Sequence, residues 1–270
     1  NLIKISNPLL LETSCLRDNI WKEHLEIVNR NIKAGQSSIY VFEIGNVFYK
    51  NTDFNQVELL NGAIFGNKKF GKWADSGKDN DLDYYQARGK LKEALSCLNI
   101  KIEDKPTNSI DFLHPGRTAK LYIEGREAGY FGEIHPKLIF ERKSLKKVYL
   151  FSINVTNLLE ASTRKNKWIP LFKQYPIVPK MERDINFVFS KKYLISEITS
   201  EIRRTGKNLL EDINLIDVYE DINLGQDFVS YTFRLSYRDK DKTLLDSDIS
   251  SIHTNIISKV EKRFNTKLRK

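Results

Sequence analysis

The chain has 270 residues, of which 40% are hydrophobic, and a formal net charge of +9. This length accommodates two domains, and the positive charge favours a polyanionic partner, although a soluble surface can carry the same charge. The sequence contains no apolar run approaching the roughly 18 residues of a membrane span, and its first residues lack a signal-peptide profile. We therefore expect a soluble chain without membrane attachment and, because it does not begin with Met, the later part of a longer protein.

Cysteine and histidine positions exclude several classes of enzyme. Cys15 and Cys97 lack the paired spacing of structural zinc ligands, so we expect both to be small core residues in a reducing compartment. The sequence contains no HExxH, G-x-S-x-G, P-loop or G-x-G-x-x-G pattern. Metalloproteases, α/β-hydrolases and the common nucleotide-binding folds are therefore excluded, and we expect no catalytic, metal or cofactor site. His114 and His135, each followed by proline, are expected in structural turns.

The first part of the chain predicts an α+β domain with a largely antiparallel sheet. Trp21, Leu25 and Val28 recur at the spacing of one helical face, which predicts a helix over residues 16–32. The run from 39 to 49 is rich in β-branched and aromatic residues and predicts a long strand. The remaining predictions are a helix over 84–98, strands over 61–65, 118–123, 129–134 and 148–155, and an exposed loop over 66–81.

A change in composition marks a boundary between two domains. Polar and basic residues follow Leu159, and prolines stand at positions 170, 176 and 179. Proline and polar residues without hydrophobic periodicity are typical of a linker. We therefore expect a first domain over residues 1–160, a linker over 161–175 and a second domain over 176–270.

The second domain predicts the element order β-α-β-β-α-β. Its expected elements are strands over 183–189, 214–219 and 228–237, helices over 194–210 and 246–264, and a last strand in the tail 266–269. This order is typical of the ferredoxin-like fold, in which two helices cover one face of a four-stranded antiparallel sheet. The opposite face of such a sheet is left open to solvent or to a ligand.

The second domain also resembles a known RNA-binding domain. The stretches Arg183–Phe189, Tyr231–Leu235 and Asp246–His253 are similar to the ferredoxin-fold anticodon-binding domain that ends the β subunits of bacterial and organellar phenylalanine-tRNA ligases. The resemblance implies that this domain binds the anticodon stem-loop of a tRNA through its sheet.

The first domain resembles the class II synthetase-like domain of the same subunits. The motifs that carry this resemblance are Asn7–Leu10, Ser14–Arg17, Phe42–Gly45, His114–Arg117 and Gly129–Pro136. Each is short, but their joint order over nearly the whole chain makes the resemblance specific. It implies an antiparallel class II synthetase-like sheet domain. Catalysis by such a domain needs an arginine that clamps the ATP phosphate, and the strand segment Phe42–Gly45 contains none. The resemblance therefore implies a non-catalytic domain.

The same resemblance implies partners and a reaction. In this family a separate α subunit holds ATP, phenylalanine and the catalytic motifs. The chain would thus be a non-catalytic part of an aminoacyl-tRNA ligase, scaffolding the α subunit in an (αβ)2 heterotetramer and binding tRNA. ATP and magnesium would be used by the holoenzyme and not bound by this chain. Editing of misacylated tRNA is not expected, because the editing segments precede this region in the full subunit. The compartment would be a bacterial cytoplasm or an organelle matrix or stroma.

Strand alternation identifies candidate RNA-binding residues on the open face of the second domain. Ser230, Thr232 and Arg234 alternate with apolar residues of the last long strand and should face away from the helices. Asp217 and Tyr219 of the neighbouring strand should share this face, where an aromatic ring can stack on an unpaired base. The alternative is an ordinary solvated sheet face with one tyrosine. The resemblance favours anticodon contact through all five residues.

The same domain carries two further expectations. Alternation places Leu215 on the outer face and Ile216 and Val218 on the inner face. Basic residues near the open face are phosphate-contact candidates, although most are expected to be solvated surface. These are Lys180, Arg183, Lys191, Lys192, Arg203, Arg204, Lys207, Arg238, Lys240 and Lys242.

Several alternatives remain open at this stage. The helix carrying Trp21, Leu25 and Val28 precedes a strand in the order of class II motif 1, so these residues could line an α-subunit interface or cover only their own sheet. A different function is a stand-alone RNA-binding or scaffold protein without a ligase partner, which would not copurify with a catalytic polypeptide. A third is an active single-chain synthetase of the organellar type, against which the missing arginines argue.

Overall fold

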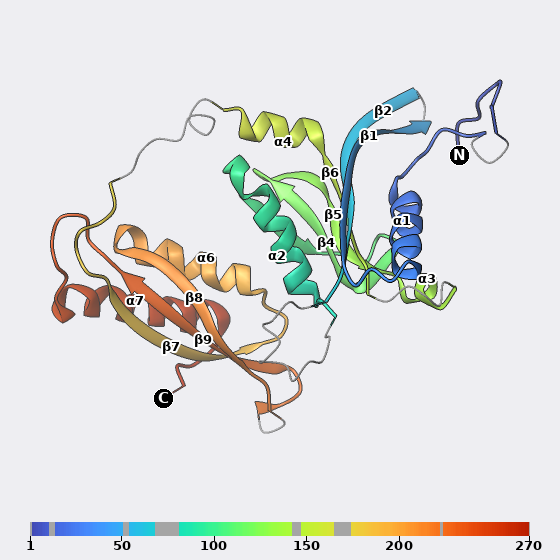
Figure 1. Cartoon of the computed structure of the whole chain (residues 1–270). Coiled ribbons are helices and arrows are strands. Elements are labelled where there is room, and N and C mark those ends of the chain that lie inside the picture. Colours follow the sequence, from blue (N-terminus) through green and yellow to red (C-terminus); the bar gives the residue numbers. More distant parts are fainter. Residues whose placement is uncertain are drawn as a thin grey trace. The chain divides into compact units, whose positions relative to one another are not determined.

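The computed structural model of the chain describes residues 2–10, 14–50, 54–67, 81–141, 147–164, 174–221 and 224–269. The chain divides into two units, residues 1–171 and 172–270. Each unit has its own sheet (Figure 1). Each also has its own buried hydrophobic residues. Most of the loop predicted over 66–81 and part of the predicted linker lie outside the described residues.

The first unit is built on one antiparallel sheet. Its strands are β1 (Ile39–Lys50), β2 (Phe54–Phe65), β3 (Ile102–Pro106), β4 (Leu113–Ile123), β5 (Arg126–Ile134) and β6 (Tyr149–Asn154). Its helices are α1 (Trp21–Lys33), α2 (Tyr84–Leu95) with a 3-10 turn at Ser96–Leu98, α3 (Pro136–Glu141) and α4 (Val155–Ser162). The strand order is β1-β2-β6-β5-β4-β3, and every neighbouring pair is antiparallel. The predicted α+β class with a largely antiparallel sheet is confirmed.

Helix α4 shows why the predicted strand over 148–155 was too long. Asn154 is the N-cap of α4, and its side chain accepts a hydrogen bond from the backbone N of Asn157 at 2.9 Å. This cap starts a helix at Val155, in a segment whose residues also suit a strand. The helix runs to Ser162, into residues that the composition assigned to a linker.

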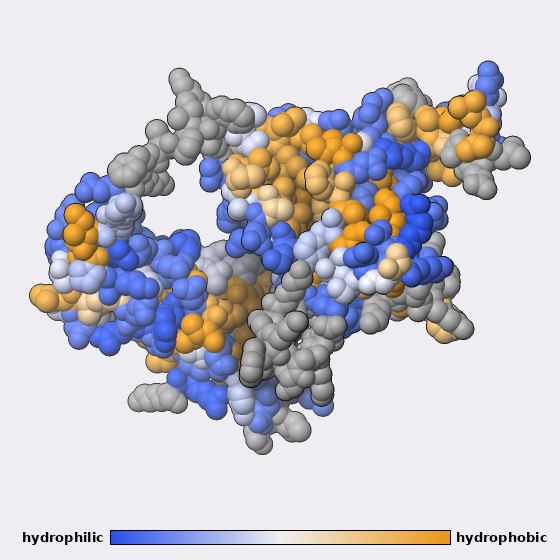
Figure 2. Space-filling view, in the orientation of Figure 1, coloured by the Kyte–Doolittle hydropathy of each residue, from blue (hydrophilic) through white to orange (hydrophobic). Residues whose placement is uncertain are grey.

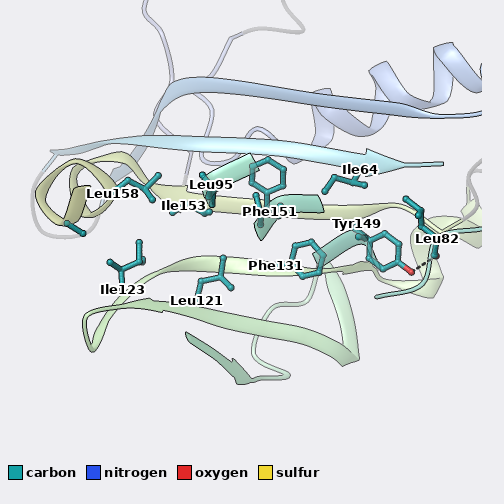
Figure 3. Packing of buried hydrophobic residues seen from close by; sticks show 14 residues of the cluster. Ile64, Leu82, Leu95, Leu121, Ile123, Phe131, Tyr149, Phe151, Ile153 and Leu158 are labelled. Atoms are coloured by element: carbon teal, nitrogen blue, oxygen red, sulfur yellow. Dashed lines mark hydrogen bonds between the residues drawn. The ribbon is translucent and has the colours of Figure 1, made fainter. Parts of the chain in front are cut away.

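Period-two alternation divides the buried side chains of β6 between the two faces of the sheet. Phe151 and Ile153 pack in one core with α2 and α4, whereas Leu150 packs with α1 in the other. In the first of these cores the Tyr149 hydroxyl donates a hydrogen bond to the backbone carbonyl of Leu82 at 2.9 Å (Figure 3). The sheet is therefore covered by helices on both faces.

Helix α1 covers the sheet of its own unit. Trp21 is 8% exposed, and Leu25 and Val28 are fully buried against residues such as Leu150. The indole N–H of Trp21 donates to the backbone carbonyl of Phe151 at 3.2 Å. Of the two roles considered for this helical face, packing on its own sheet is confirmed, and these three side chains are not available to a partner.

The second unit has the predicted β-α-β-β-α-β order. Its elements are β7 (Met181–Ser190), α6 (Ile195–Gly206) with a 3-10 turn at Lys207–Leu209, β8 (Leu210–Tyr219), β9 (Phe228–Tyr237) and α7 (Asp246–Phe264). The strands lie in the antiparallel order β7-β9-β8, and α6 and α7 pack on one face of this sheet around a single core. The long strands and both helices thus follow the ferredoxin-like arrangement.

The fourth strand of the second unit is shorter than predicted. A single antiparallel bridge joins Leu268 to Phe187 on the free edge of β7. The backbone N of Arg269 donates to the carbonyl of Asn186 at 2.8 Å, and the Thr266 hydroxyl donates to the carbonyl of Val188 at 2.5 Å. The tail therefore lies along β7 without forming a full ladder.

A buried carboxylate joins the two helices of the second unit. Glu201 in α6 is 1% exposed and accepts hydrogen bonds from Arg204 at 2.6 Å and from Arg263 of α7. The hydrogen bond from Arg204 is the chief reason that the pKa of Glu201 is lowered. Since the folded-state pKa is the lower one, this stabilisation is present above the ordinary glutamate pKa and is lost as the pH falls through the lowered pKa.

Replacing Glu201 by glutamine should lower the free energy of unfolding by about 1.5–3 kcal/mol at neutral pH, the usual worth of hydrogen bonds to a charged group. The loss should shrink as the pH falls below the ordinary glutamate pKa of about 4.3, because the unfolded state then binds a proton before the native carboxylate does. Urea unfolding of both proteins at several pH values measures this. Glu220→Gln is the control, since that carboxylate pairs with Lys191 on the exposed surface of the same unit. A loss independent of pH would contradict the assignment.

Candidate nucleic-acid interface

The open face of the β7-β9-β8 sheet lies opposite helices α6 and α7. Phe233 of β9 is fully buried under the helices, so the alternating residues Ser230 and Thr232 point to the other face. The antiparallel register brings Tyr219 of β8 opposite Ser230 and Asp217 opposite Thr232. The structure therefore brings together on one face the residues that alternation selected.

A β-bulge in β8 changes the face of Leu215. The register shifts between Leu215 and Asp217, so that Leu215 lies opposite Phe233 on the helix-covered face and Ile216 is the extra residue. The outward placement predicted for Leu215 is wrong, because strict alternation fails at a bulge. Ile216, the extra residue, is 44% exposed and is not the inner residue that was expected. Val218 lies opposite Tyr231 on the helix-covered face, as predicted, but is 51% exposed.

Ser230 and Thr232 are tied to β7 by a cross-strand network. Ser230 is only 1% exposed and donates a hydrogen bond to Oδ1 of Asn186 at 2.8 Å. Nδ2 of Asn186 in turn donates to the Thr232 hydroxyl at 2.8 Å. The open exposure predicted for Ser230 is therefore wrong, because β7 supplies a partner for its hydroxyl. The same alternation applied to β7 would have identified Asn186.

Arg234 is held on the open face by a carboxylate. Its Nε and Nη2 donate to the two carboxylate oxygens of Asp184, each at 2.8 Å. The hydrogen bond raises the pKa of Arg234 and lowers that of Asp184. A phosphate that approached Arg234 would therefore have to compete with Asp184.

Tyr219 meets a cation from the C-terminal tail. Cζ of Arg269 lies 5.6 Å from the centroid of the Tyr219 ring, and the Tyr219 hydroxyl donates to Asp221 at 2.6 Å. That hydrogen bond is the chief cause of the raised pKa of Tyr219. The sequence alone did not identify Arg269, because its position depends on where the tail joins the sheet. The ring remains 43% exposed.

Carboxylates are prominent on the open face. The register with β9 places Glu182, Asp184, Asp212 and Asp217 there. Of the basic residues considered as phosphate contacts, many form ion pairs, namely Lys180, Arg183, Lys191, Arg204, Arg238 and Lys242. Carboxylates repel phosphates but accept hydrogen bonds from base N–H groups, so this face suits base edges better than an RNA backbone.

The first unit carries an exposed apolar row on its outermost strand. Tyr40, Phe42 and Ile44 of β1 are 52%, 72% and 55% exposed. They alternate with Val41, which packs with the α1 core, so they lie on the opposite face of the sheet. Strand β1 is at the edge of the sheet, and Figure 2 shows hydrophobic residues gathered on the visible face of this unit. Such an edge suits a protein partner.

Structural contacts account for the short motifs of the first unit. Glu43 pairs with Arg17 at 2.8 Å, and a Cβ at Gly45 would lie 2.3 Å from the Arg17 guanidinium. Arg117 pairs with Glu133 at 3.0 Å, joining β4 to β5. Close packing therefore explains the glycine and the charged residues of these motifs.

The predictions for histidines and cysteines have different outcomes. Nδ1 of His135 accepts from the backbone N of Lys137 at 3.2 Å, between β5 and α3, which confirms its role in a turn. His114 lies inside β4, at the register irregularity between Leu113 and Thr118, so the turn predicted for it is wrong, although its Nδ1 accepts from the backbone N of Gly116 at 3.0 Å. Cys97 is exposed on the 3-10 turn after α2, and Cys15 is half-buried. The core placement predicted for both cysteines is wrong, because Cys97 lies on an exposed turn and Cys15 lies in a segment that only bridges to Lys4.

Two kinds of feature are absent from the described residues. These residues contain no group of three or more His, Cys, Asp or Glu side chains placed to hold a metal ion. None of the helices in the described ranges is both long and apolar enough to cross a membrane.

Comparisons with known proteins cover both units. Residues 1–155 match the family described as phenylalanyl tRNA synthetase beta chain CLM domain, and residues 176–269 match the ferredoxin-fold anticodon binding domain. Relatives named phenylalanine–tRNA ligase beta subunit include one from Prochlorococcus marinus strain MIT 9312, 81% identical over 99% of this chain, and one from Synechococcus sp. strain CC9605, 42% identical over 99%. The chain spans 33% of the length of each of these relatives. Since the first family match covers more than half of the chain, the chain belongs to the phenylalanyl-tRNA synthetase beta chain family.

Proposed function

We propose that the chain is a non-catalytic part of a phenylalanine-tRNA ligase, which attaches phenylalanine to its tRNA with ATP. Residues 1–160 scaffold the catalytic α subunit, and residues 176–270 bind the anticodon stem-loop. Residues 161–175 form the linker between these two domains. The relatives' names and the two family matches support this. ATP and magnesium serve the holoenzyme, an (αβ)2 heterotetramer in a bacterial cytoplasm or an organelle, and are not bound by this chain.

The proposed class II synthetase-like character of the first unit is supported by its sheet. The six strands are antiparallel, and α1 directly precedes β1, as in a class II motif 1. In the segment Phe42–Gly45, where a catalytic domain would place an arginine, Glu43 is instead engaged by Arg17. These features favour a scaffold over a catalytic site.

The surface proposed to meet the α subunit is the outer edge of β1. It replaces the buried face of α1, which cannot reach a partner. Tyr40, Phe42 and Ile44 expose apolar area on the edge strand of the sheet. Burial of this row against a second protein would remove these apolar side chains from water.

The observation that carries the anticodon proposal is that Tyr219 and Asp217 lie side by side on the open face of the second unit, opposite Ser230 and Thr232. The Tyr219 ring stacks on an unpaired base, and Asp217 accepts hydrogen bonds from a base edge. Ser230 and Thr232 hold Asn186 in place beside them. Arg234, fixed by Asp184, supplies a positive charge on the same face.

Replacing Asp217 by alanine should mainly relax discrimination between anticodons. We expect the preference for the cognate over a variant anticodon to fall about 10-fold, the equivalent of one charge-assisted hydrogen bond, with a smaller change in cognate affinity. The measurement is tRNA binding by the assembled enzyme containing the full-length subunit. Asp246→Ala removes a carboxylate that pairs with Arg183 at the start of α7, one of the helices that cover the opposite face, and should leave discrimination unchanged. Equal effects of the two substitutions would argue against the proposal.

A further inference from the structure

A cavity of about 300 Å³ lies in the first unit, on the face of the sheet that α1 covers. Asn61 of β2, Ser152 of β6 and Tyr130 of β5 line it. The register places Asn61 opposite Ser152 and Ser152 opposite Tyr130, so the three side chains form one row across three adjacent strands. Trp21, at the start of α1, lines it as well.

Polar groups with unmet hydrogen-bonding capacity surround this cavity. Asn61 is 1% exposed, and its Nδ2 donates to the carbonyl of Leu59 at 3.2 Å, which orients the amide. Its Oδ1 accepts no hydrogen bond within the described part of the chain. The same holds for the hydroxyl of Ser152, which is 8% exposed, and for the buried Oδ1 of Asn19. Since a buried polar atom is normally hydrogen-bonded, the Oδ1 of Asn19 indicates an occupant that donates hydrogen bonds. The oxygens of Asn61 and Ser152 line the same cavity and can accept from the same occupant.

The remaining lining favours a cation. Asp18 and Glu127 contribute carboxylates, and Tyr49 and Tyr130 contribute aromatic rings. Hydrogen bonds from the Tyr130 hydroxyl at 2.6 Å and from Lys120 at 3.0 Å lower the pKa of Glu127, which therefore stays ionised at neutral pH. Burial raises the pKa of Tyr49, with a contribution from Asp18, so its hydroxyl stays neutral. Acceptors, carboxylates and aromatic rings together suit an ammonium group.

We propose that this cavity binds a small primary amine in its ammonium form. The three N–H donors of the ammonium reach the oxygens of Asn19, Asn61 and Ser152, and the apolar body lies against Trp21 and Tyr49. At about 30 Å³ per water-sized group, the volume holds roughly ten non-hydrogen atoms. This site is separate from the open sheet face on which the proposed RNA binding depends, so neither proposal rests on the other.

Titration of the 270-residue chain with benzylammonium tests the proposal, and benzyl alcohol is the matched uncharged probe. The readout is the indole N–H resonance of Trp21 in ¹⁵N-labelled protein, assigned with a Trp21→Phe variant. We expect a saturable shift with a Kd of about 1 mM or below for the amine. The alcohol should bind at least about tenfold more weakly, since it carries no charge. Absence of a saturable shift, or equal binding of the two probes, would overturn the proposal.

Substitution of residues that line the cavity distinguishes an effect on amine binding from an effect on the stability of the fold. Ser152→Ala and Asn61→Leu should each weaken benzylammonium binding at least about fivefold. Ser152→Ala should not lower the melting temperature, because its hydroxyl has no partner among the described residues. Asn61→Leu also loses the hydrogen bond from Nδ2 to the carbonyl of Leu59, so its melting temperature should fall only modestly. Ser162→Ala is the control, since this buried serine lies on α4 outside the cavity and its hydroxyl donates to Leu159. Unchanged binding in both lining variants would contradict the assignment.

Discussion

Replacing Tyr219 by alanine should weaken binding of cognate tRNA to the assembled ligase by about 5- to 150-fold, because loss of one stacking ring costs about 1–3 kcal/mol per base. The ring is 43% exposed on the open face of the second unit, beside Asp217. Arg269 already lies over it, so a base that stacks there replaces or shares this cation. Filter binding or fluorescence titration with the holoenzyme measures the effect.

Two further variants identify the ring as the cause. Tyr219→Phe keeps the aromatic surface and loses only the hydrogen bond to Asp221, so its affinity should stay within about threefold of the native value. Tyr85→Ala removes a tyrosine that is 82% exposed on α2 of the first unit and should have no effect on anticodon preference. If Tyr219→Ala folds normally and binds cognate tRNA with native affinity and preference, the open sheet face is not the recognition surface.

Local sequence patterns predicted a helix or strand well where the spacing of its apolar residues keeps one period along its whole length. Helix α7 occupies Asp246–Phe264, which is the predicted range. Its apolar spacing is uninterrupted, and Asn265, whose backbone is left-handed, ends the helix. The patterns failed where a single residue changes the geometry. Asn154 caps a helix inside a strand-like segment, and Ile216 forms a bulge that reverses the face of Leu215.

The part of the candidate site that lies on the strand pair β8 and β9 was predictable from the sequence. Alternation along β8 and β9 placed Tyr219 and Asp217 correctly, since both lie beyond the bulge and in register with β9. Alternation could not show that the hydroxyl of Ser230 donates a hydrogen bond to Asn186. That bond joins residues 44 positions apart in the sequence, which only the strand order of the sheet brings together. Arg269 depends on the same topology, since the tail reaches Tyr219 only after it bridges to β7.

The largest effect on stability is expected at Gly129, in the interior of the first unit's sheet. A Cβ at this position would lie 1.9 Å from the carbonyl oxygen of Ser152 and 2.8 Å from Cα of Ile153, both on β6. Strand β5 lies between β6 and β4, so movement away from β6 would press it against β4 or displace β4 and β3 with it. The close approach of two backbones therefore explains why the motif that begins at Gly129 starts with glycine.

Gly129→Ala should accordingly lower the free energy of unfolding of the first unit by about 3 kcal/mol or more, the upper range for added atoms in a well-packed core. The same substitution at Gly89 is the matched control. Gly89 lies in α2, and a Cβ there meets no atom within 4 Å, so Gly89→Ala should instead raise stability by up to about 1 kcal/mol through helix propensity. Urea unfolding of the 270-residue chain, followed by circular dichroism and by Trp fluorescence, measures both. If Gly129→Ala unfolds at the native urea concentration, the two strands have room to separate, and the close backbone packing of β5 on β6 is not required for the fold.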